Sequence, residues 1–203
     1  MFIKICGLSG PETLAAAVAA GADAVGFVFA PGSPRTVTAE VARELVAQVP
    51  DTVETVGVFR GQPIDEVIAT ARAAGVRTVQ LHGGEPVADL DRLRTEKLGT
   101  IRALSVAEYL GLLEEDPEGL KRHRLLLDAP IPGAGIPFDP APILSHPPFV
   151  GWILAGGLTP SNVAELIGQV HPTGVDVSSG VESSRGIKDA LLIAQFIAAA
   201  RNA

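Results

Sequence analysis

The first residues of the chain carry side chains that could support acid–base chemistry. An apolar run over residues 2–6 ends on Cys6, the only cysteine, and breaks at Gly7. In a β-strand, Lys4 and Cys6 would share one face, because successive side chains alternate between faces. The ordinary pKa of a thiol is about 8.5, and a nearby cation favours the thiolate that serves as a general base. A lone cysteine is more often a small core residue, so it is the position of Cys6 at a strand tip that favours a functional role.

A carboxylate lies at the end of another apolar run. Asp128 follows three leucines of a strand that is expected to be buried. Burying an ionised carboxylate is costly, so a carboxylate at this position is expected to have a function. Polar or ionisable side chains are also expected at the ends of three further strands, namely Gln80, His82, Arg102, Asp176 and Ser178. For Lys4 and Asp176, a structural ion pair and a direct catalytic role fit the sequence equally well.

Two loops contain the residues that bind phosphate in many proteins. Gly156 and Gly157 lie between a predicted strand and a predicted helix, and Ser178, Ser179 and Gly180 follow the next strand. Glycine lets backbone amides approach an anion closely. The Gly-Gly pair alone also fits a tight turn, but two such loops after the seventh and eighth strands indicate a phosphate site. A sugar phosphate is therefore the expected ligand.

Eight strand-and-helix units can be read along the chain. Strands are predicted from short apolar runs at residues 2–6, 24–29, 54–59, 77–82, 98–103, 123–128, 150–155 and 175–178. Helices are predicted to start near Pro11, Thr38, Pro63, Pro86, Ser105 and Pro160, with a short helix after a loop at 129–137 and a last one from about Ile187. Ser105 and Glu108 have the spacing of a capping box.

This alternation predicts a single-domain (β/α)8 barrel over residues 1–203, a TIM barrel with parallel strands inside and helices outside. Glycines at three helix-to-strand joints, Gly21, Gly75 and Gly174, are expected to end helices in the left-handed conformation. About 25 residues per unit is near the lower limit for this fold, in which roughly 250 residues are typical. A doubly wound open sheet is the alternative, but it would need a dinucleotide fingerprint that the residues after Gly7 lack.

The composition argues against several classes of protein. The chain has 203 residues, of which 47% are hydrophobic, enough for one large core. The net charge of −7 and the scattered Lys and Arg residues argue against a nucleic-acid partner. One cysteine excludes an internal disulfide, and the four histidines lack ligand spacing, so we expect a cytoplasmic protein without structural zinc. We find neither a signal peptide nor a membrane span.

The circular order of strands in a barrel brings two of the candidate residues together. The sixth strand lies three places from the first, so Cys6 and Asp128 should face each other across the mouth of the barrel. A base and an acid on opposite sides of one site suit an isomerase, which removes a proton from one atom and delivers a proton to another. The residues therefore predict an isomerase acting on a phosphorylated small molecule.

Six motifs spread over the chain are more specific. They read KICGL at 4–8, GFVF with SPR at 26–29 and 33–35, VQLHG at 79–83, LD at 127–128, LAGGL at 154–158 and GVDVSSGVE at 174–182. Together they resemble the phosphoribosylanthranilate isomerase family of tryptophan biosynthesis. The resemblance implies an Amadori rearrangement, in which the ribose ring of N-(5-phosphoribosyl)anthranilate opens and a 1-deoxyribulose ketone forms through an enolamine. It implies no metal and no organic cofactor.

The resemblance also implies roles for individual residues. Cys6 would be the general base that takes the C2′ proton, and Asp128 the general acid that protonates the ring oxygen. Arg35 would hold the anthranilate carboxylate. The phosphate would be held by amides around Gly157, Ser179 and Gly180. We count His82, Gly156, Asp176 and Ser178 with the substrate-binding residues, and we expect a monomer or a homodimer.

One segment departs from the family pattern. Family members usually carry a Gly-Gly-Thr-Gly-like loop after the acid, whereas residues 132–139 read PGAGIPFD here. The prolines would stiffen this loop, and the missing threonine removes a candidate hydrogen bond to the substrate. We expect altered loop-closing kinetics and not a different reaction.

Two other functions fit parts of the sequence. A pentulose-phosphate epimerase would use similar phosphate loops, but such enzymes generally need metal ligands, and His82 lacks the expected carboxylate and histidine companions. A catalytically inactive barrel that binds a sugar phosphate as a regulator belongs to a different class, and the intact Cys6 and Asp128 argue against it. Metal-dependent epimerisation would support the first alternative, and binding without turnover would support the second.

Overall fold

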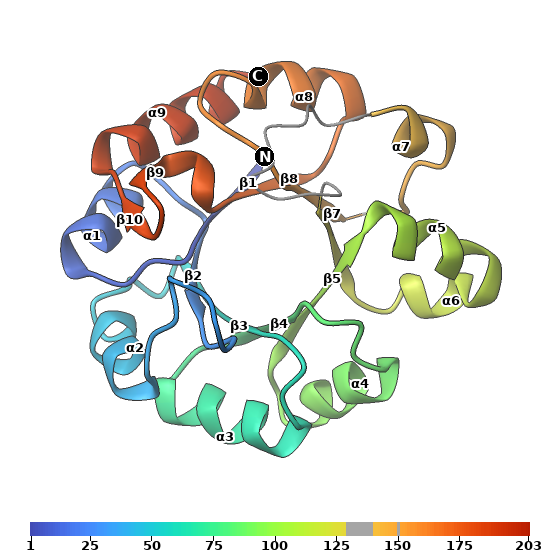
Figure 1. Cartoon of the computed structure of the whole chain (residues 1–203), viewed down its shortest axis with the longest axis horizontal. Helices are drawn as coiled ribbons and strands as arrows, with labels where there is room; N and C mark the ends of the chain where they lie inside the picture. Colours follow the sequence, from blue (N-terminus) through green and yellow to red (C-terminus); the bar gives the residue numbers. More distant parts are fainter. Residues whose placement is uncertain (129–139, 150) are drawn as a thin grey trace.

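The computed structural model, which describes residues 1–128, 140–149 and 151–203, is a closed barrel of parallel strands surrounded by helices (Figure 1). Each strand pairs with the next, and the last pairs with the first. The closure confirms the predicted (β/α)8 barrel and excludes the open sheet. The strands are β1 (Phe2–Cys6), β2 (Ala24–Val28), β3 (Glu54–Phe59), β4 (Thr78–Leu81), β5 (Gly99–Ser105), β6 (Arg124–Asp128), β7 (Trp152–Ala155) and β8 (Gly174–Val177).

The helices lie outside the barrel (Figure 1). They are α1 (Pro11–Ala19), α2 (Ala39–Val46), α3 (Ile64–Ala74), α4 (Val87–Thr95), α5 (Val106–Glu115), α6 (Pro117–Leu120), α7 (Ala141–Ser145), α8 (Val163–Val170) and α9 (Ala190–Arg201). Within the described ranges, no helix has the length and apolar character that crossing a membrane requires. The loop predicted at 129–137 and the predicted strand start at Val150 lie outside the described residues.

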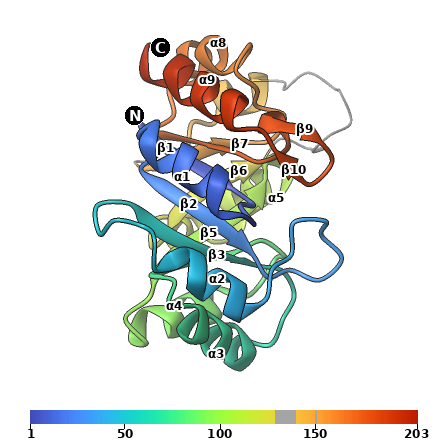
Figure 2. The same ribbon diagram turned by 90° about the vertical axis from the view of Figure 1, so that its left-hand side faces the viewer.

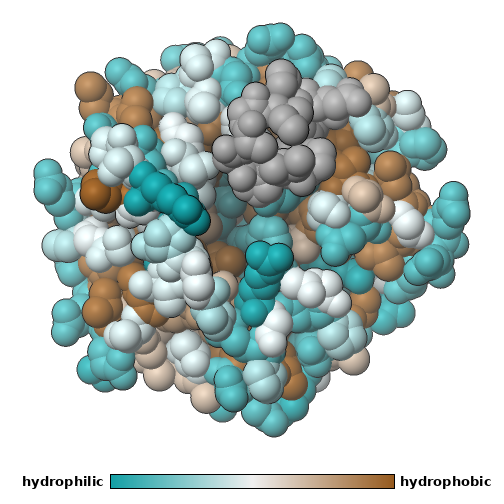
Figure 3. Space-filling view, viewed as in Figure 1, coloured by the Kyte–Doolittle hydropathy of each residue, from teal (hydrophilic) through white to brown (hydrophobic). Residues whose placement is uncertain are grey.

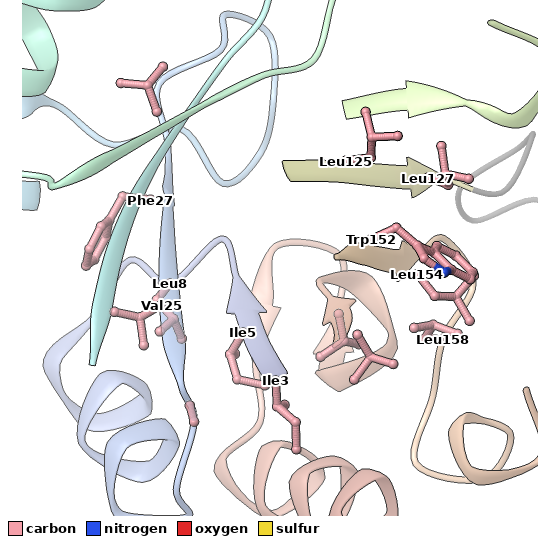
Figure 4. Packing of buried hydrophobic residues seen from close by; sticks show 14 of the residues in the cluster. Ile3, Ile5, Leu8, Val25, Phe27, Leu125, Leu127, Trp152, Leu154 and Leu158 are labelled. Carbon is pink, nitrogen blue, oxygen red and sulfur yellow. The ribbon is translucent and has the colours of Figure 1, made fainter. Parts of the chain in front are cut away.

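Both faces of the strands are buried, which explains their nearly continuous apolar sequences. Ile3 and Ile5 of β1 and Val25 and Phe27 of β2 point away from the barrel axis and pack in the layer beneath the helices (Figure 4). A separate cluster contains Ala24, Val56, Ile101, Ala103, Leu126, Ile153 and Ala155 and fills the barrel interior. Side chains alternate along a strand, so a residue two positions after a member of this cluster also points inward. Such residues, at the ends of the strands, reach the mouth of the barrel.

The helix starts follow the local signals in the sequence. The Ser105 hydroxyl accepts a hydrogen bond from the Glu108 amide at 3.2 Å, and the Glu108 carboxylate accepts one from the Ser105 amide at 2.7 Å. This reciprocal arrangement confirms the predicted capping box at the start of α5. The Thr38 side chain caps α2 by a single hydrogen bond, which its hydroxyl accepts from the amide of Val41 at 3.3 Å.

The three glycine joints do not behave alike. Gly21 and Gly75 have φ angles of 90° and 75° and end α1 and α3 in the left-handed conformation, as predicted. The prediction is wrong for Gly174, because His171 takes the left-handed position after α8, with a φ of 49°. Gly174 lies within β8, where a Cβ atom would be 2.9 Å from the carbonyl oxygen of Phe2. Glycine is required there by close strand packing and not by backbone conformation.

The end of the chain also differs from the sequence interpretation. A 3-10 turn at Ser179–Val181 leads into a small antiparallel hairpin of β9 (Glu182–Ser184) and β10 (Ile187–Lys188), where the last helix was expected to begin. Helix α9 starts only at Ala190, because the Asp189 carboxylate caps it by accepting from the amides of Leu191 and Leu192 at 2.8 and 3.0 Å.

The hairpin lies at the opposite end of the barrel from the two chain termini (Figure 2). Arg201 at the end of α9 holds the termini together by donating hydrogen bonds to the carbonyl oxygens of Met1 and Gly21 at 2.5 and 2.9 Å. The hairpin therefore stands at the carboxyl-terminal ends of the strands, the end at which barrels of this kind carry their active sites.

Replacing Asp189 by alanine tests the assignment of the α9 start. The variant loses two charge-assisted hydrogen bonds to helix amides, and we expect the free energy of unfolding to fall by about 1 kcal/mol. Urea unfolding followed by circular dichroism measures the change. Asp189→Asn keeps an acceptor at the same place and should lose clearly less, and an equal loss in both variants would contradict the capping role.

Candidate active site

A cavity of about 280 Å³ opens at the carboxyl-terminal ends of the strands. In the view down the barrel (Figure 3), hydrophilic residues gather around the centre of this face. The structure brings ten of the candidate residues into the lining of this one cavity, namely Cys6, Arg35, His82, Asp128, Gly156, Gly157, Asp176, Ser178, Ser179 and Gly180. A second hollow shares Arg60, His82 and Asp128 with it and is also lined by Gly83, Gly84 and Glu108.

Cys6 ends β1 with its side chain on the inward face, 6% exposed. Gly26 on the adjacent strand leaves room for the sulfur, since a Cβ atom there would lie 3.1 Å from Sγ. Burial raises the pKa of the Cys6 thiol above its usual range, although the positive charges of Lys4 and Lys188 act in the opposite direction. The charge of Lys4 thus favours the thiolate, as predicted from the sequence, but desolvation raises the pKa of Cys6 by more than this charge lowers it.

Lys4 and Asp176 form a buried ion pair at the seam between β1 and β8. Their Nζ and Oδ1 atoms are 2.9 Å apart, and the Lys4 side chain is fully buried. Burial alone would lower the pKa of Lys4, but the charges of Asp176 and Cys6 more than compensate and raise it. Lys4 is therefore a charged group beneath the cavity, whereas Asp176 also contributes to its wall.

Asp128 ends β6 on the other side of the cavity, facing His82. His82 Nε2 lies 3.4 Å from Asp128 Oδ2, while Asp128 Oδ1 is buried and has no hydrogen-bond partner among the described residues. Gln80 Oε1 lies in the wall of the same cavity. It is also buried, and no described residue forms a hydrogen bond with it. Buried polar atoms without partners are costly, so both atoms are suited to form hydrogen bonds with a ligand.

Arg102 does not belong to the site, contrary to the expectation from sequence. Its neighbours Ile101 and Ala103 both lie in the interior cluster, so Arg102 faces outward toward the helices. Burial lowers the pKa of its guanidinium, with the carboxylates of Asp116 and Glu108 acting in the opposite direction. The error arises because alternation along a strand leaves a one-residue ambiguity, which reverses the face of every side chain.

The two predicted phosphate loops lie in contact. Gly156 and Gly157 have φ angles of 86° and 65°, and their amides have no hydrogen-bond acceptor within the described residues. A Cβ atom on Gly180 would lie 1.8 Å from the carbonyl oxygen of Leu158, so only glycine lets the second loop approach the first. Backbone amides from two glycine-containing loops in contact are a suitable anion site.

Arg35 reaches the cavity from the loop after β2 and is paired with a residue that received no role from sequence. Its Nε and Nη2 atoms lie 2.5 and 2.8 Å from the two oxygens of Glu182. Lys188 Nζ lies 2.7 Å from the same carboxylate. In the sequence, Glu182 is only the last residue of a motif, and Lys188 belongs to none of the motifs. The signal for both is the Arg-Gly pair at 185–186, which separates two short segments as a hairpin turn does.

The described residues contain no group of three or more His, Cys, Asp or Glu side chains placed to hold a metal ion. The cavity lining includes the Cys6 thiol, the carboxyl groups of Asp128 and Asp176, the guanidinium groups of Arg35 and Arg60, and the two glycine-containing loops. The segment at 132–139, which departs from the family pattern, lies outside the described residues.

Comparison with known proteins bears directly on this site. The family model described as N-(5'phosphoribosyl)anthranilate (PRA) isomerase matches residues 3–199. A relative from Deinococcus radiodurans named N-(5'-phosphoribosyl)anthranilate isomerase is 44% identical, over 98% of this chain and 96% of the relative. The chain belongs to the phosphoribosylanthranilate isomerase family.

Solved structures of this family share the fold over the whole chain. TrpF from Jonesia denitrificans has 43% identity and a TM-score of 0.87, covering 100% of this chain and 97% of its own. Phosphoribosyl anthranilate isomerase from Thermotoga maritima has 36% identity and a TM-score of 0.90, covering 100% of both chains. A further member, at 35% identity, was solved with reduced 1-(o-carboxyphenylamino)-1-deoxyribulose 5-phosphate. These comparisons confirm the resemblance inferred from the motifs.

The burial of Cys6 leads to a prediction about its reactivity. Because burial raises the pKa of the thiol, we expect the rate of alkylation by iodoacetamide to keep rising above pH 9 in the folded protein. Mass spectrometry measures the rate at each pH without ambiguity, since Cys6 is the only cysteine. The protein unfolded in urea is the control and should show a midpoint near 8.5. A folded-state midpoint below that of the unfolded chain would contradict the prediction.

Proposed function

We propose that this chain catalyses the Amadori rearrangement of N-(5'-phosphoribosyl)anthranilate to 1-(2-carboxyphenylamino)-1-deoxyribulose 5-phosphate in tryptophan biosynthesis. The observation that carries the proposal is the placement of Cys6 and Asp128 in one cavity that also contains the two glycine loops. Family membership over residues 3–199 supports the substrate. The compound in complex with the related isomerase, a reduced form of the product, supports it as well.

Asp128 acts first, as the general acid. It delivers a proton to the ring oxygen of the ribose while the lone pair of the anilino nitrogen forms a C1′=N double bond, and the bond between C1′ and the ring oxygen breaks. The position of Asp128 at the tip of β6, with one oxygen buried and lacking a partner among the described residues, allows it to face the ligand directly. His82, 3.4 Å from its other oxygen, limits the orientations of the carboxyl group.

Cys6 acts second, as the general base. Its thiolate removes the C2′ proton, and the electrons of the C–H bond form a C1′=C2′ double bond and neutralise the iminium nitrogen. The resulting enolamine becomes the ketone when the C2′ hydroxyl loses its proton and C1′ gains one. Lys4 and Lys188 favour the thiolate electrostatically, which opposes the effect of burial.

The remaining residues bind the two ends of the substrate. Amides around Gly156, Gly157, Ser179 and Gly180 receive the phosphate, and Arg35 receives the anthranilate carboxylate. We place His82, Asp176 and Ser178 against the ribose between these ends, because all three line the same cavity. Each contact acts on a charged or hydroxyl group of the substrate, so binding depends on both of its ends being present.

We further propose that residues 1–203 act as one domain in the cytoplasm, without a metal or organic cofactor. The single cysteine and the biosynthetic role of the family support this location. A relative from Thermotoga maritima is described as a dimeric phosphoribosylanthranilate isomerase. For this chain, a monomer and a homodimer both fit the proposed chemistry, because all assigned residues come from one chain.

The reaction can be measured directly, and two variants test the catalytic pair. Phosphoribosylanthranilate generated in situ should lose its anthranilate fluorescence at the same rate with and without a metal chelator. Cys6→Ala and Asp128→Asn should each lower kcat by at least about 10²-fold, the low end for losing one acid or base. Circular dichroism and inhibition by inorganic phosphate serve as controls for fold and binding.

Near-normal turnover in either variant would remove that residue from its role. A folded wild-type protein that leaves the fluorescence at its uncatalysed rate would refute the isomerase. If it still bound phosphorylated sugars, the inactive regulatory barrel would be the better description. Loss of turnover in the chelator would contradict the expectation of metal-free chemistry.

Arg35→Ala tests the carboxylate site. The variant loses charge-assisted hydrogen bonds to the substrate, which are worth about 1.5–3 kcal/mol, so KM should rise roughly 10- to 100-fold. We expect kcat to change much less, because the guanidinium does not touch the reacting carbons. Inhibition by inorganic phosphate should be unaffected. An unchanged KM would exclude Arg35 from the anthranilate site.

A further inference from the structure

We propose that Glu182 and Lys188, on the β9–β10 hairpin, are positioning residues that present Arg35 to the carboxylate of an aromatic substrate and link it to the phosphate loop. The proposal rests on the proposed function and assigns roles to two side chains that do not line the cavity themselves. Both are almost completely buried, with side-chain exposures of 4% and 2%. Charged groups are rarely buried to this extent unless each is fully paired.

Glu182 is saturated by hydrogen bonds. Oε1 accepts from Arg35 Nε at 2.5 Å and from Lys188 Nζ at 2.7 Å. Oε2 accepts from Arg35 Nη2 at 2.8 Å and from the amide of Gly186 at 2.9 Å. Burial alone would raise the pKa of Glu182, but these hydrogen bonds lower it to about 2. The carboxylate is thus ionised and has no capacity left for a ligand.

Lys188 is saturated in the same way. Its ammonium group donates to the Ser178 carbonyl oxygen at 2.8 Å and to the Ser178 hydroxyl at 3.3 Å, besides its bond to Glu182. An ammonium group has three hydrogens, and three acceptors surround this one. Because Ser178 begins the loop that is proposed to hold the phosphate, Lys188 links the two binding ends of the site.

Arg35 is restrained on two sides by these contacts. Glu182 occupies the Nε and Nη2 edge of its guanidinium as a two-point pair. The aliphatic part of the side chain packs over Gly7, where a Cβ atom would lie 2.7 Å from Cδ of Arg35. Nη1 has no hydrogen-bond acceptor within the described residues, so the Nη1 and Nη2 end of the fork is the edge left for a ligand carboxylate.

The hairpin is seated on the loop that carries Arg35. Gly186 at its turn has a φ of 86°, and a Cβ atom there would lie 3.2 Å from both Cβ and the carbonyl oxygen of Pro34. The same glycine donates its amide to Glu182. The hairpin therefore contacts both the side chain of Arg35 and the preceding residue, Pro34. These two contacts suit an element that fixes the position of Arg35.

The charges permit a decisive test, because positioning and electrostatics predict opposite results. Arg35, Glu182 and Lys188 together carry a net charge of +1, from two cations and one carboxylate. If Glu182 only reduced the positive charge, Glu182→Gln would strengthen the attraction for an anionic substrate and lower KM. If Glu182 positions Arg35, the same change disrupts the fork and raises KM.

The experiment compares Glu182→Gln, Arg35→Ala and the double variant in the fluorescence assay. We expect Glu182→Gln to raise KM at least about tenfold, with kcat within roughly threefold and inhibition by inorganic phosphate unchanged. In the Arg35→Ala background, the second substitution should add less than about twofold, because Glu182 acts through Arg35. Arg185→Gln, which removes an exposed charge from the same hairpin, is the matched control and should leave KM unchanged.

Glu182→Asp provides a second variant should the glutamine variant fold poorly. It keeps the charge but is one methylene too short for the two-point pair. A positioning role therefore predicts a raised KM, whereas a purely electrostatic role predicts an unchanged KM. Lys188→Met should weaken inhibition by inorganic phosphate as well as raise KM, because it releases Ser178. A lowered or unchanged KM in both Glu182 variants, or additive effects with Arg35→Ala, would overturn the proposal. An inactive wild-type protein would instead refute the proposed function.

Discussion

The buried ion pair between Lys4 and Asp176 joins the first strand of the barrel to the last. The two residues are partners in the β1–β8 register, so the pair forms only when the barrel is closed. Removing one partner would leave a buried charge without compensation, which typically costs about 3–5 kcal/mol. Because β1 and β8 are held in this register, Cys6 and Ser178 reach the same mouth, and the site can be assembled from both ends of the chain.

Two groups of charges flank the thiol above this seam. The Lys4–Asp176 pair is neutral and lies beneath the cavity, whereas Arg35, Glu182 and Lys188 carry a net positive charge beside it. Burial raises the pKa of Cys6, and the two lysines oppose that effect. The net positive charge that would attract an anionic ligand to the mouth therefore also acts on the Cys6 thiol, the proposed base.

Much of the fold was predictable because its signals are local. The eight strand segments, the capping box at Ser105 and the left-handed glycines at Gly21 and Gly75 each depend on residues close together in sequence. The failures have equally definite causes. Gly174 is a glycine because of a neighbouring strand, and the β9–β10 hairpin is seated through Glu182, which pairs with Arg35 at a separation of 147 residues in sequence. Arg102 points outward because register, not composition, decides the face of a strand residue.

The sequence by itself determined which residues are candidates for the chemistry and that they end parallel strands, since alternation and turn signals are short-range. It could therefore assign Cys6 and Asp128 to one mouth through the circular order of the strands. The sequence offered an ion pair between Lys4 and Asp176 as one of two interpretations, but only the tertiary structure decided that they pair and that Arg35 pairs with Glu182. Lys4 and Asp176 are 172 residues apart, and Arg35 and Glu182 are 147 apart. Contacts at such separations depend on barrel closure and on side-chain packing, which no local pattern in the chain encodes.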